Sequence, residues 1–381
     1  MTRAFTDFYS QHGAELVSRQ YDGRERLFRS REALFLSLGV PPSSLHGRSI
    51  LEFGPGTGHY SVFNLAQDPE SCLFVEGVPA ARDALEARVR QESGEAVEWS
   101  VDESYFEDFD TRKRFDFVIA ESCIPHQKDP RSLFRQFSTY VKPGGILVIT
   151  TASGASYLSE TLRRLVRDKI ISPTESVDTQ LKIMTPIFAK HLSHLNGVSR
   201  NAEDWVLDAI IQPLGEVRLF GIAEAITAVD ENFYVLGSAP KFIQDFAWHR
   251  TLVNPETHSR ENALKSYFCN LCNLLDVRHQ SISIDREVGQ TLERFCNDLW
   301  EAMGNLEAEL GENWNPVFEC LKRIEKVLID IDPPCRGPFQ EVADWLSGDS
   351  KDATALREFP QWWGVGQQHL AFYRGKYFEE V

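Results

Sequence analysis

Long apolar runs are missing from this chain of 381 residues. No stretch approaches the roughly 20 uninterrupted apolar residues that cross a membrane as a helix. The first seven residues, MTRAFTD, also lack the apolar segment of a secretory signal peptide. We therefore expect no membrane span and a cytoplasmic location.

Cysteine is sparse, with seven residues scattered along the chain. An odd number of cysteines in a long chain argues against a disulfide framework and favours reduced thiols. Only Cys269 and Cys272 have C-x-x-C spacing, and they lie within an apolar stripe at helical period. Because no second pair of ligands accompanies them, we interpret them as small core residues rather than as zinc ligands.

A metal site has little support elsewhere in the sequence. His191 and His194 are three residues apart on a helix expected to begin near Pro186, a spacing that a metal accepts. No set of carboxylates lies nearby in the sequence, so we interpret them as ordinary helix histidines and expect no metal.

Positive charge is in short supply, since 40 Lys and Arg residues face 56 Asp and Glu residues for a net charge of −16. Affinity for nucleic acid comes mainly from Lys and Arg at phosphates, so this balance disfavours general nucleic-acid binding. One basic run, Arg163, Arg164, Arg167 and Lys169, predicts a solvated helix face, or alternatively attraction of a phosphate or carboxylate substrate.

The middle of the chain alternates short apolar runs with helix-like segments, a pattern typical of a parallel α/β sheet. The pattern predicts strands at 49–53, 72–76, 97–101, 115–120 and 145–150, followed by two more at 216–221 and 233–237. We expect an α/β fold with a doubly wound, seven-stranded, mostly parallel sheet whose last strand is antiparallel.

Helical patterns flank and interrupt this core. We expect a helical cap over 1–44, a core formed by 45–154 and 213–240, a helical insertion over 155–212, and a mostly helical C-terminal extension over 241–381. The insertion leaves the end of the fifth strand, and open α/β sheets bind ligands at that edge. The insertion over 155–212 is therefore expected to help form the pocket for the acceptor, the substrate that receives a transferred group, or to act as the lid of that pocket.

The most informative segment is 49–58, SILEFGPGTG, in which an apolar strand leads into glycines at 54, 56 and 58. Glycine lets a ligand approach the main chain closely. The dinucleotide pattern G-x-G-x-x-G would require glycine at 59, where this chain has His59, so the spacing disfavours a nicotinamide cofactor. Glu76 ends the second strand, where a carboxylate can accept hydrogen bonds from both ribose hydroxyls.

The segment 50–58 resembles the first motif of the class I S-adenosylmethionine-dependent methyltransferases. Later segments are also similar to that family: Glu76, Asp102 after the third strand, the fourth strand at 115–120, and the Pro-Gly-Gly turn into the fifth strand at 141–149. The resemblance covers roughly 45–153 well, 214–240 loosely and the remainder hardly at all.

The resemblance implies S-adenosylmethionine as cofactor and S-adenosylhomocysteine as product. By the same resemblance, Glu76 with Gly77 binds the ribose and Asp102 contacts adenine. The methionine and ribose portion lies near Glu52, Gly54, Pro55, Gly56 and Gly58, while the methyl group is bordered by Glu121 and Ser122.

The reaction implied is an in-line displacement, and its catalytic candidates follow the fourth strand. Glu121 is one. His126 is the candidate base, because imidazole titrates near neutrality, although a histidine at the Asp129-Pro130 helix start has an equally plausible capping role. The sequence after Glu121 lacks an N-P-P-Y-like motif, which disfavours transfer to nucleobase nitrogen.

Aromatic residues outside the core are candidates for acceptor contacts: Tyr9, Tyr21, Trp205, Trp362 and Trp363, with packing as the alternative for each. We expect a methyltransferase acting on a small-molecule acceptor, at oxygen in the first instance. The alternatives are transfer to nitrogen or carbon, an inactive methyltransferase-like scaffold, and a nicotinamide oxidoreductase.

Overall fold

The computed structural model describes residues 8, 23–92, 97–125, 127–172, 174–196, 200–214, 217–280 and 283–377. Its described residues form two compact units that interleave along the chain. Unit 1 takes residues 152–219 and 268–367. Unit 2 takes the described residues of 6–151, together with 220–267 and 368–377.

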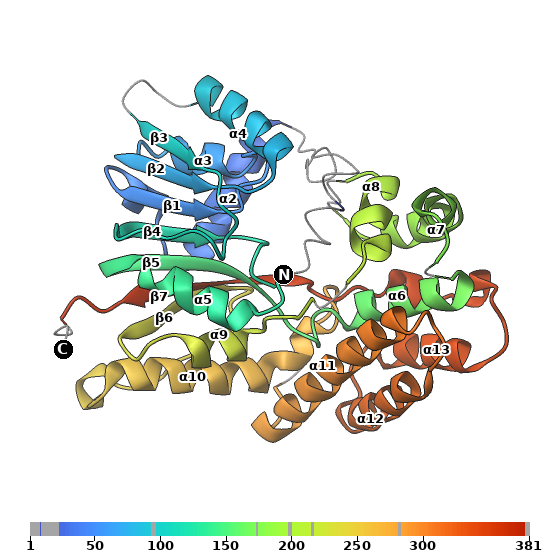
Figure 1. The fold of residues 1–381 in the computed structure, drawn as a ribbon. Coiled ribbons are helices and arrows are strands. Elements are labelled where there is room, and N and C mark those ends of the chain that lie inside the picture. The colour runs from blue at the N-terminus through green and yellow to red at the C-terminus, as the bar shows by residue number, and fades with distance from the viewer. Residues whose placement is uncertain are drawn as a thin grey trace. The chain divides into compact units, whose positions relative to one another are not determined.

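The sheet is seven-stranded, in the order β3-β2-β1-β4-β5-β7-β6 (Figure 1). Strand β1 pairs in parallel with β2 and β4, β2 with β3, and β4 with β5, whereas β6 and β7 are antiparallel. The strands span Ser49–Phe53 (β1), Ser71–Val75 (β2), Glu98–Asp102 (β3), Phe115–Ala120 (β4), Val141–Ala152 (β5), Phe233–Ala239 (β6) and Gln367–Arg374 (β7). The predicted mostly parallel α/β fold is therefore confirmed.

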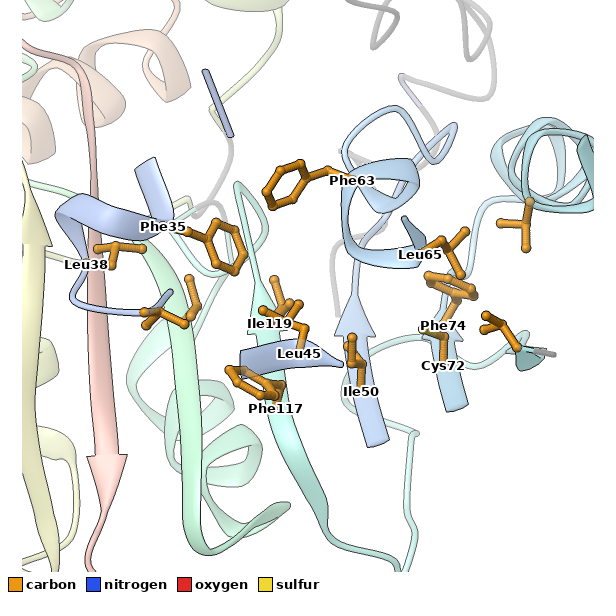
Figure 2. Close-up of a cluster of buried hydrophobic side chains, with 14 of the residues drawn as sticks. Phe35, Leu38, Leu45, Ile50, Phe63, Leu65, Cys72, Phe74, Phe117 and Ile119 are labelled. Carbon is orange, nitrogen blue, oxygen red and sulfur yellow. The ribbon is translucent and has the colours of Figure 1, made fainter. Parts of the chain in front are cut away.

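Helices cover this sheet: α2 (Arg24–Ser37), α3 (Ser61–Leu65), α4 (Pro79–Glu92), α5 (Pro130–Thr139), α9 (Ile222–Ala228) and most of α10 (Pro255–Asn270). Helix α5 begins where the sequence indicates, because Asp129 caps it by accepting from the Ser132 backbone N–H at 3.0 Å and Pro130 occupies its first turn. Figure 2 shows the core that α2 and α3 form with the strands, in which Phe35, Phe63, Ile50 and Phe117 are buried.

The main helices of unit 1 are α6 (Leu158–Ile170), α7 (Val177–Leu192), α8 (Ala202–Val206), α11 (Arg286–Ala308), α12 (Asn315–Ile331) and α13 (Arg336–Ser347). The prediction that Arg163, Arg164 and Arg167 of α6 form a solvated face is wrong, because all three are buried. Arg164 and Arg167 both pair with Glu307 of α11, and Arg163 donates to the Trp362 carbonyl oxygen at 2.5 Å. Buried acceptors, not solvent, satisfy this basic run.

The structure corrects three further expectations about elements. No strand covers the described part of 216–221, since residues 217–219 are irregular and only Phe220 forms an isolated bridge. The seventh strand comes instead from β7, a segment that the sequence suggested was part of the helical extension. Helix α7 begins at Val177, not near Pro186, which lies inside the helix.

Candidate functional site

The glycine loop follows β1 at the carboxyl edge of the parallel strands. Gly54, Gly56 and Gly58 have φ angles of 64°, 56° and 75°, a region that residues with a side chain rarely adopt. The loop is also crowded, because a Cβ at Gly54 would lie 3.1 Å from the Cβ of Cys123. A turn in which the Gly58 N–H donates to the Pro55 carbonyl oxygen at 2.9 Å closes it.

Glu76 lies directly after β2 and is only 6% exposed. Its Oε2 accepts from the Gly56 backbone N–H at 3.0 Å, and its Oε1 accepts from the Val78 backbone N–H at 2.9 Å. Burial raises the pKa of Glu76, and these two N–H groups oppose that rise. Each carboxylate oxygen has two lone pairs, so both oxygens retain the capacity to accept a further hydrogen bond.

Asp102 ends β3, and its partner in the register is Val75, the residue before Glu76. The Glu76 N–H donates to the Asp102 carbonyl oxygen at 3.0 Å, so the two acids follow adjacent strand ends. The half-buried Asp102 carboxylate accepts from the Ser104 N–H at 2.9 Å. Gly77 faces Tyr105, since a Cβ at Gly77 would lie 2.8 Å from a ring carbon of that tyrosine.

Glu52 is buried in β1 beneath the glycine loop. The Ser61 hydroxyl donates to it at 2.7 Å and the Asn64 amide at 3.2 Å. Burial raises the pKa of Glu52 to about 7, because these neutral donors compensate only in part for the lost hydration. The carboxyl group is therefore poised to titrate near neutrality.

Glu121 belongs to a cluster of charged groups that also contains Arg31 of α2 and His369 of β7. Arg31 donates to both carboxylate oxygens of Glu121, at 2.9 and 2.7 Å, and Nε2 of His369 lies 3.2 Å from Oε1. Burial on its own would raise the pKa of Glu121, but Arg31 and His369 outweigh it and hold that pKa well below its usual range. Glu121 is therefore ionised and held in one orientation.

Of the remaining candidate residues, the structure describes Ser122 and leaves three others undescribed. Ser122 has a φ of 59°, a strained angle for a residue with a side chain, immediately after Glu121. His126, Tyr9 and Tyr21 lie outside the described residues.

The candidate tryptophans belong to unit 1. Trp362 and Trp363 are 0% and 2% exposed, and their indole N–H groups donate to the carbonyl oxygens of Leu275 and His191. The Arg163 guanidinium lies 3.6 Å from the Trp363 ring centroid, and the half-buried Trp205 contacts the same ring edge-on. Such contacts are those of core aromatic residues.

The described residues contain no group of three or more His, Cys, Asp or Glu side chains arranged to hold a metal ion. Cys272 and His191 are buried, and burial lowers the pKa of His191 to about 2. Within the ranges that the structure covers, no helix is both long and apolar enough to cross a membrane.

Arg31 was missed by the sequence interpretation, and no catalytic role was predicted for His369. Arg31 lies four residues from both Leu27 and Phe35, and these three residues form the buried face of α2. A cation in the middle of an apolar helix face indicates a buried anionic partner, so this signal was present in the sequence. For His369 only the weak alternation within 367–374 was available.

Comparison with known proteins gives one family. Residues 19–184 match the family model described as a methyltransferase domain. The chain is 28% identical over 148 residues to a ubiquinone biosynthesis O-methyltransferase of Bradyrhizobium sp. (strain ORS 278), a match that covers 34% of this chain and 55% of the relative. It is 26% identical over 167 residues to phosphoethanolamine N-methyltransferase 2 of Caenorhabditis elegans, covering 40% of this chain and 37% of that protein.

Among solved structures, the N-methyltransferase NodS from Bradyrhizobium japonicum WM9 in complex with S-adenosyl-l-homocysteine is 23% identical with a TM-score of 0.30. That match covers 39% of this chain and 74% of NodS. The chain spans about half or less of the length of the two curated relatives. Residues 19–184 thus match a methyltransferase domain, and the seven-stranded, mostly parallel sheet has the fold of the class I S-adenosylmethionine-dependent methyltransferases.

Proposed function

We propose that this chain transfers the methyl group of S-adenosylmethionine to a hydroxyl oxygen of a small molecule, such as a sugar or another biosynthetic metabolite. The observation that carries the proposal is the buried Glu76 carboxylate, which is fixed by the Gly56 and Val78 N–H groups beside a loop of positive-φ glycines. This arrangement fits a nucleoside, because it presents two oriented acceptors next to the main chain of the glycine loop.

In this proposal each acid at the strand ends contacts a different part of the cofactor. Glu76, with Gly77, accepts from the two ribose hydroxyls, and Asp102 faces the adenine. The methionine and ribose portion lies against Gly54, Pro55, Gly56 and Gly58 above Glu52, and the methyl group is bordered by Glu121 and Ser122. When bound, the cofactor supplies a methyl group that its sulfonium already activates.

The charge at the edge of the sheet favours a hydroxyl acceptor. Arg31 neutralises Glu121 through two hydrogen bonds, so the pair carries no net charge with which to select a cationic amine. The names of the curated relatives do not decide the matter, since one is an O-methyltransferase and the other an N-methyltransferase. Transfer to an amine nitrogen is the second candidate, and the second relative favours it.

Calorimetric titration with S-adenosylhomocysteine tests cofactor binding. Loss of the Glu76 carboxylate in Glu76→Ala removes two charge-assisted hydrogen bonds to ribose, so we expect the affinity to fall by about 10- to 100-fold. The matched control is Glu70→Ala, an exposed acid at the opposite end of β2, which is expected to leave the affinity unchanged.

Two outcomes would overturn the proposal. No heat of binding for the unaltered chain at high micromolar product excludes cofactor binding. Equal affinity in Glu76→Ala would instead support the methyltransferase-like scaffold. A parallel titration with NAD examines the oxidoreductase alternative, for which no binding is expected.

A further inference from the structure

The carboxylate–imidazole pair of Glu121 and His369 stands at the same edge as the glycine loop. Phe53 of β1 pairs with Ala120 of β4, so Gly54 and Glu121 are the next residues along two neighbouring strands. His369 follows Gln368, whose carbonyl oxygen accepts from the Thr151 hydroxyl at 3.3 Å near the end of β5. The ends of β4 and β5 and the start of β7 thus bring the pair, within unit 2, to the edge of the sheet where we propose that the cofactor binds.

One ring nitrogen of His369 contacts Glu121, and the other can accept a hydrogen bond. Nε2 lies 3.2 Å from the Glu121 carboxylate, which accepts its hydrogen and so fixes the ring tautomer with the lone pair on Nδ1. Among the residues that the structure describes, Nδ1 has no hydrogen-bond partner. The His369 side chain is 24% exposed, whereas those of Arg31 and Glu121 are 4% and 9% exposed.

Arg31 holds the carboxylate of the pair ionised and in place. Its guanidinium is held by two hydrogen bonds to Glu121 and lies 4.6 Å from the centroid of the Tyr60 ring. An ionised, immobile Glu121 both orients the imidazole and stabilises the imidazolium that forms when Nδ1 takes a proton. A carboxylate that is already neutralised is not itself a strong base, so the proton acceptor of the cluster is the imidazole.

We propose that His369 is the general base of the transfer and that Glu121 is its positioning residue. This inference rests on the proposed function. The acceptor oxygen forms a bond to the methyl carbon as the carbon–sulfur bond breaks. The bonding electron pair stays on sulfur, which becomes a neutral thioether, and the hydroxyl proton passes to Nδ1 of His369. The imidazolium then releases this proton to water.

Other titratable groups face the cluster and have to be separated from His369 in any pH profile. Glu52 of β1 is close enough to Arg31 and Glu121 to influence both, and burial raises its own pKa to about 7. Tyr60 and Arg31 also face the cluster, and the buried Cys123 is close enough to Glu121 to be influenced by its charge. Measurements are therefore made in the unaltered chain and repeated in the Glu52→Gln background.

The first test compares turnover in His369→Gln with turnover in His258→Gln. His258 is a matched control because it also pairs with a carboxylate, Asp245, at 2.8 Å, and is similarly exposed. With tritiated S-adenosylmethionine and 3,4-dihydroxybenzoate as hydroxyl probe, we expect His369→Gln to lower kcat by about 10²–10⁴-fold. We expect KM within about threefold of the unaltered value, and loss of the acid limb of the pH profile.

The second test requires no acceptor. Sinefungin carries an ammonium group where S-adenosylmethionine carries its methyl group, so the ratio of its affinity to that of S-adenosylhomocysteine reports charge at the methyl position. Between pH 5.5 and 8 we expect this ratio to fall at least fivefold toward acid pH in the Glu52→Gln background, which cannot ionise at residue 52, as the imidazole becomes protonated. In that same background, His369→Gln is expected to make the ratio independent of pH.

The outcomes separate the two proposals. If S-adenosylhomocysteine does not bind the unaltered chain, the proposed function fails and the inference fails with it. If it binds, but the sinefungin ratio in the Glu52→Gln background has the same pH dependence with His369→Gln as without it, only the role of His369 is overturned. A kcat in His369→Gln equal to that of the unaltered chain would overturn it as well.

Discussion

Glu52 in β1 and Glu121 directly after β4 both lie near the Arg31 guanidinium. Of the two, only Glu121 is hydrogen-bonded to it, and the two carboxyl groups differ in protonation for that reason. Glu121 accepts hydrogen bonds from both terminal nitrogens of the Arg31 guanidinium and has a third contact with His369, so it stays ionised. Glu52 receives only a hydroxyl and an amide, and the charge of Glu121 further disfavours its ionisation. The same edge of the sheet therefore holds one permanent anion and one acid that titrates near neutrality.

The Glu52 carboxyl predicts a pH-dependent stability. Its pKa is about 7 in the folded chain and close to 4.5 when exposed, so the unfolded chain loses this proton first as the pH rises. Stability should fall between pH 4.5 and 7 by about 3 kcal/mol and then level off. Because Glu52→Gln cannot ionise, we expect it to be more stable than the unaltered chain at pH 8 and nearly equal to it at pH 4.5.

Urea unfolding at several pH values, without cofactor, measures this difference. Glu98→Gln is the control, since Glu98 is exposed on β3 and its substitution should give a curve parallel to that of the unaltered chain. A Glu52→Gln curve that is also parallel between pH 4.5 and 8 would contradict the raised pKa.

At the scale of elements, α2 is held to the sheet by a close contact with β6. Gly237 lies so near the end of α2 that an added Cβ would stand 2.5 Å from the Leu38 carbonyl oxygen and 2.6 Å from its carbon. Both are backbone atoms, which cannot move without shifting the helix end. We expect Gly237→Ala to lower the free energy of unfolding by about 1–3 kcal/mol.

The matched control for this substitution is Gly304→Ala in α11, where a Cβ would meet nothing within 4 Å. Alanine at that helical position should be neutral or stabilise by up to about 1 kcal/mol, as its helix propensity predicts. Chemical denaturation of both variants decides the matter, and an equal free energy for Gly237→Ala and the unaltered chain would show that β6 and α2 are not packed as described.

The sequence predicted those elements whose signal is local. The first five strands are short apolar runs between helical patterns, and all five occur within a few residues of their expected bounds. The segment 216–221 has a similar composition, but its described residues 217–221 pair only through an isolated bridge at Phe220, and apolar periodicity alone does not distinguish the two cases. Strand β7 was missed because its alternation is short and follows an aromatic, glycine-rich segment.

The same contrast separates the parts of the candidate site. The glycine loop, Glu76 and Asp102 follow strands in chain order, so a local pattern identifies them. Arg31 and Glu121 are 90 residues apart, and His369 is on the last strand, so only the folded sheet brings them together. The buried Arg run of α6 was misinterpreted for a related reason, since Glu307 and Trp362, the partners of its arginines, are far from α6 in the sequence.

At the scale of the molecule, unit 2 depends on a segment that follows almost all of unit 1 in the sequence. Strand β7 lies between β5 and β6, and its residues Leu370, Ala371 and Phe372 are all 0% exposed. A chain that ends at residue 366 would lose this strand together with His369. It would leave β5 and β6 without the strand that both of them pair with.

We therefore expect a chain of residues 1–366 to lose cooperative unfolding, whereas a chain of residues 1–377, which retains all of β7, keeps it. Burying Leu370 and Phe372 contributes roughly 1.5–3 kcal/mol each, and the ladder hydrogen bonds of β7 add to this. Such a loss is a large part of the 5–15 kcal/mol that stabilises a typical domain, so the shortened sheet should bind hydrophobic dye and give a broad, probe-dependent urea transition.

If the 1–366 chain unfolded in one sharp transition within about 1 kcal/mol of the 1–377 chain, β7 would be dispensable to the sheet. The edge of the sheet at which we propose that the cofactor binds would then be complete without it, and the role proposed for His369 would lose its structural basis.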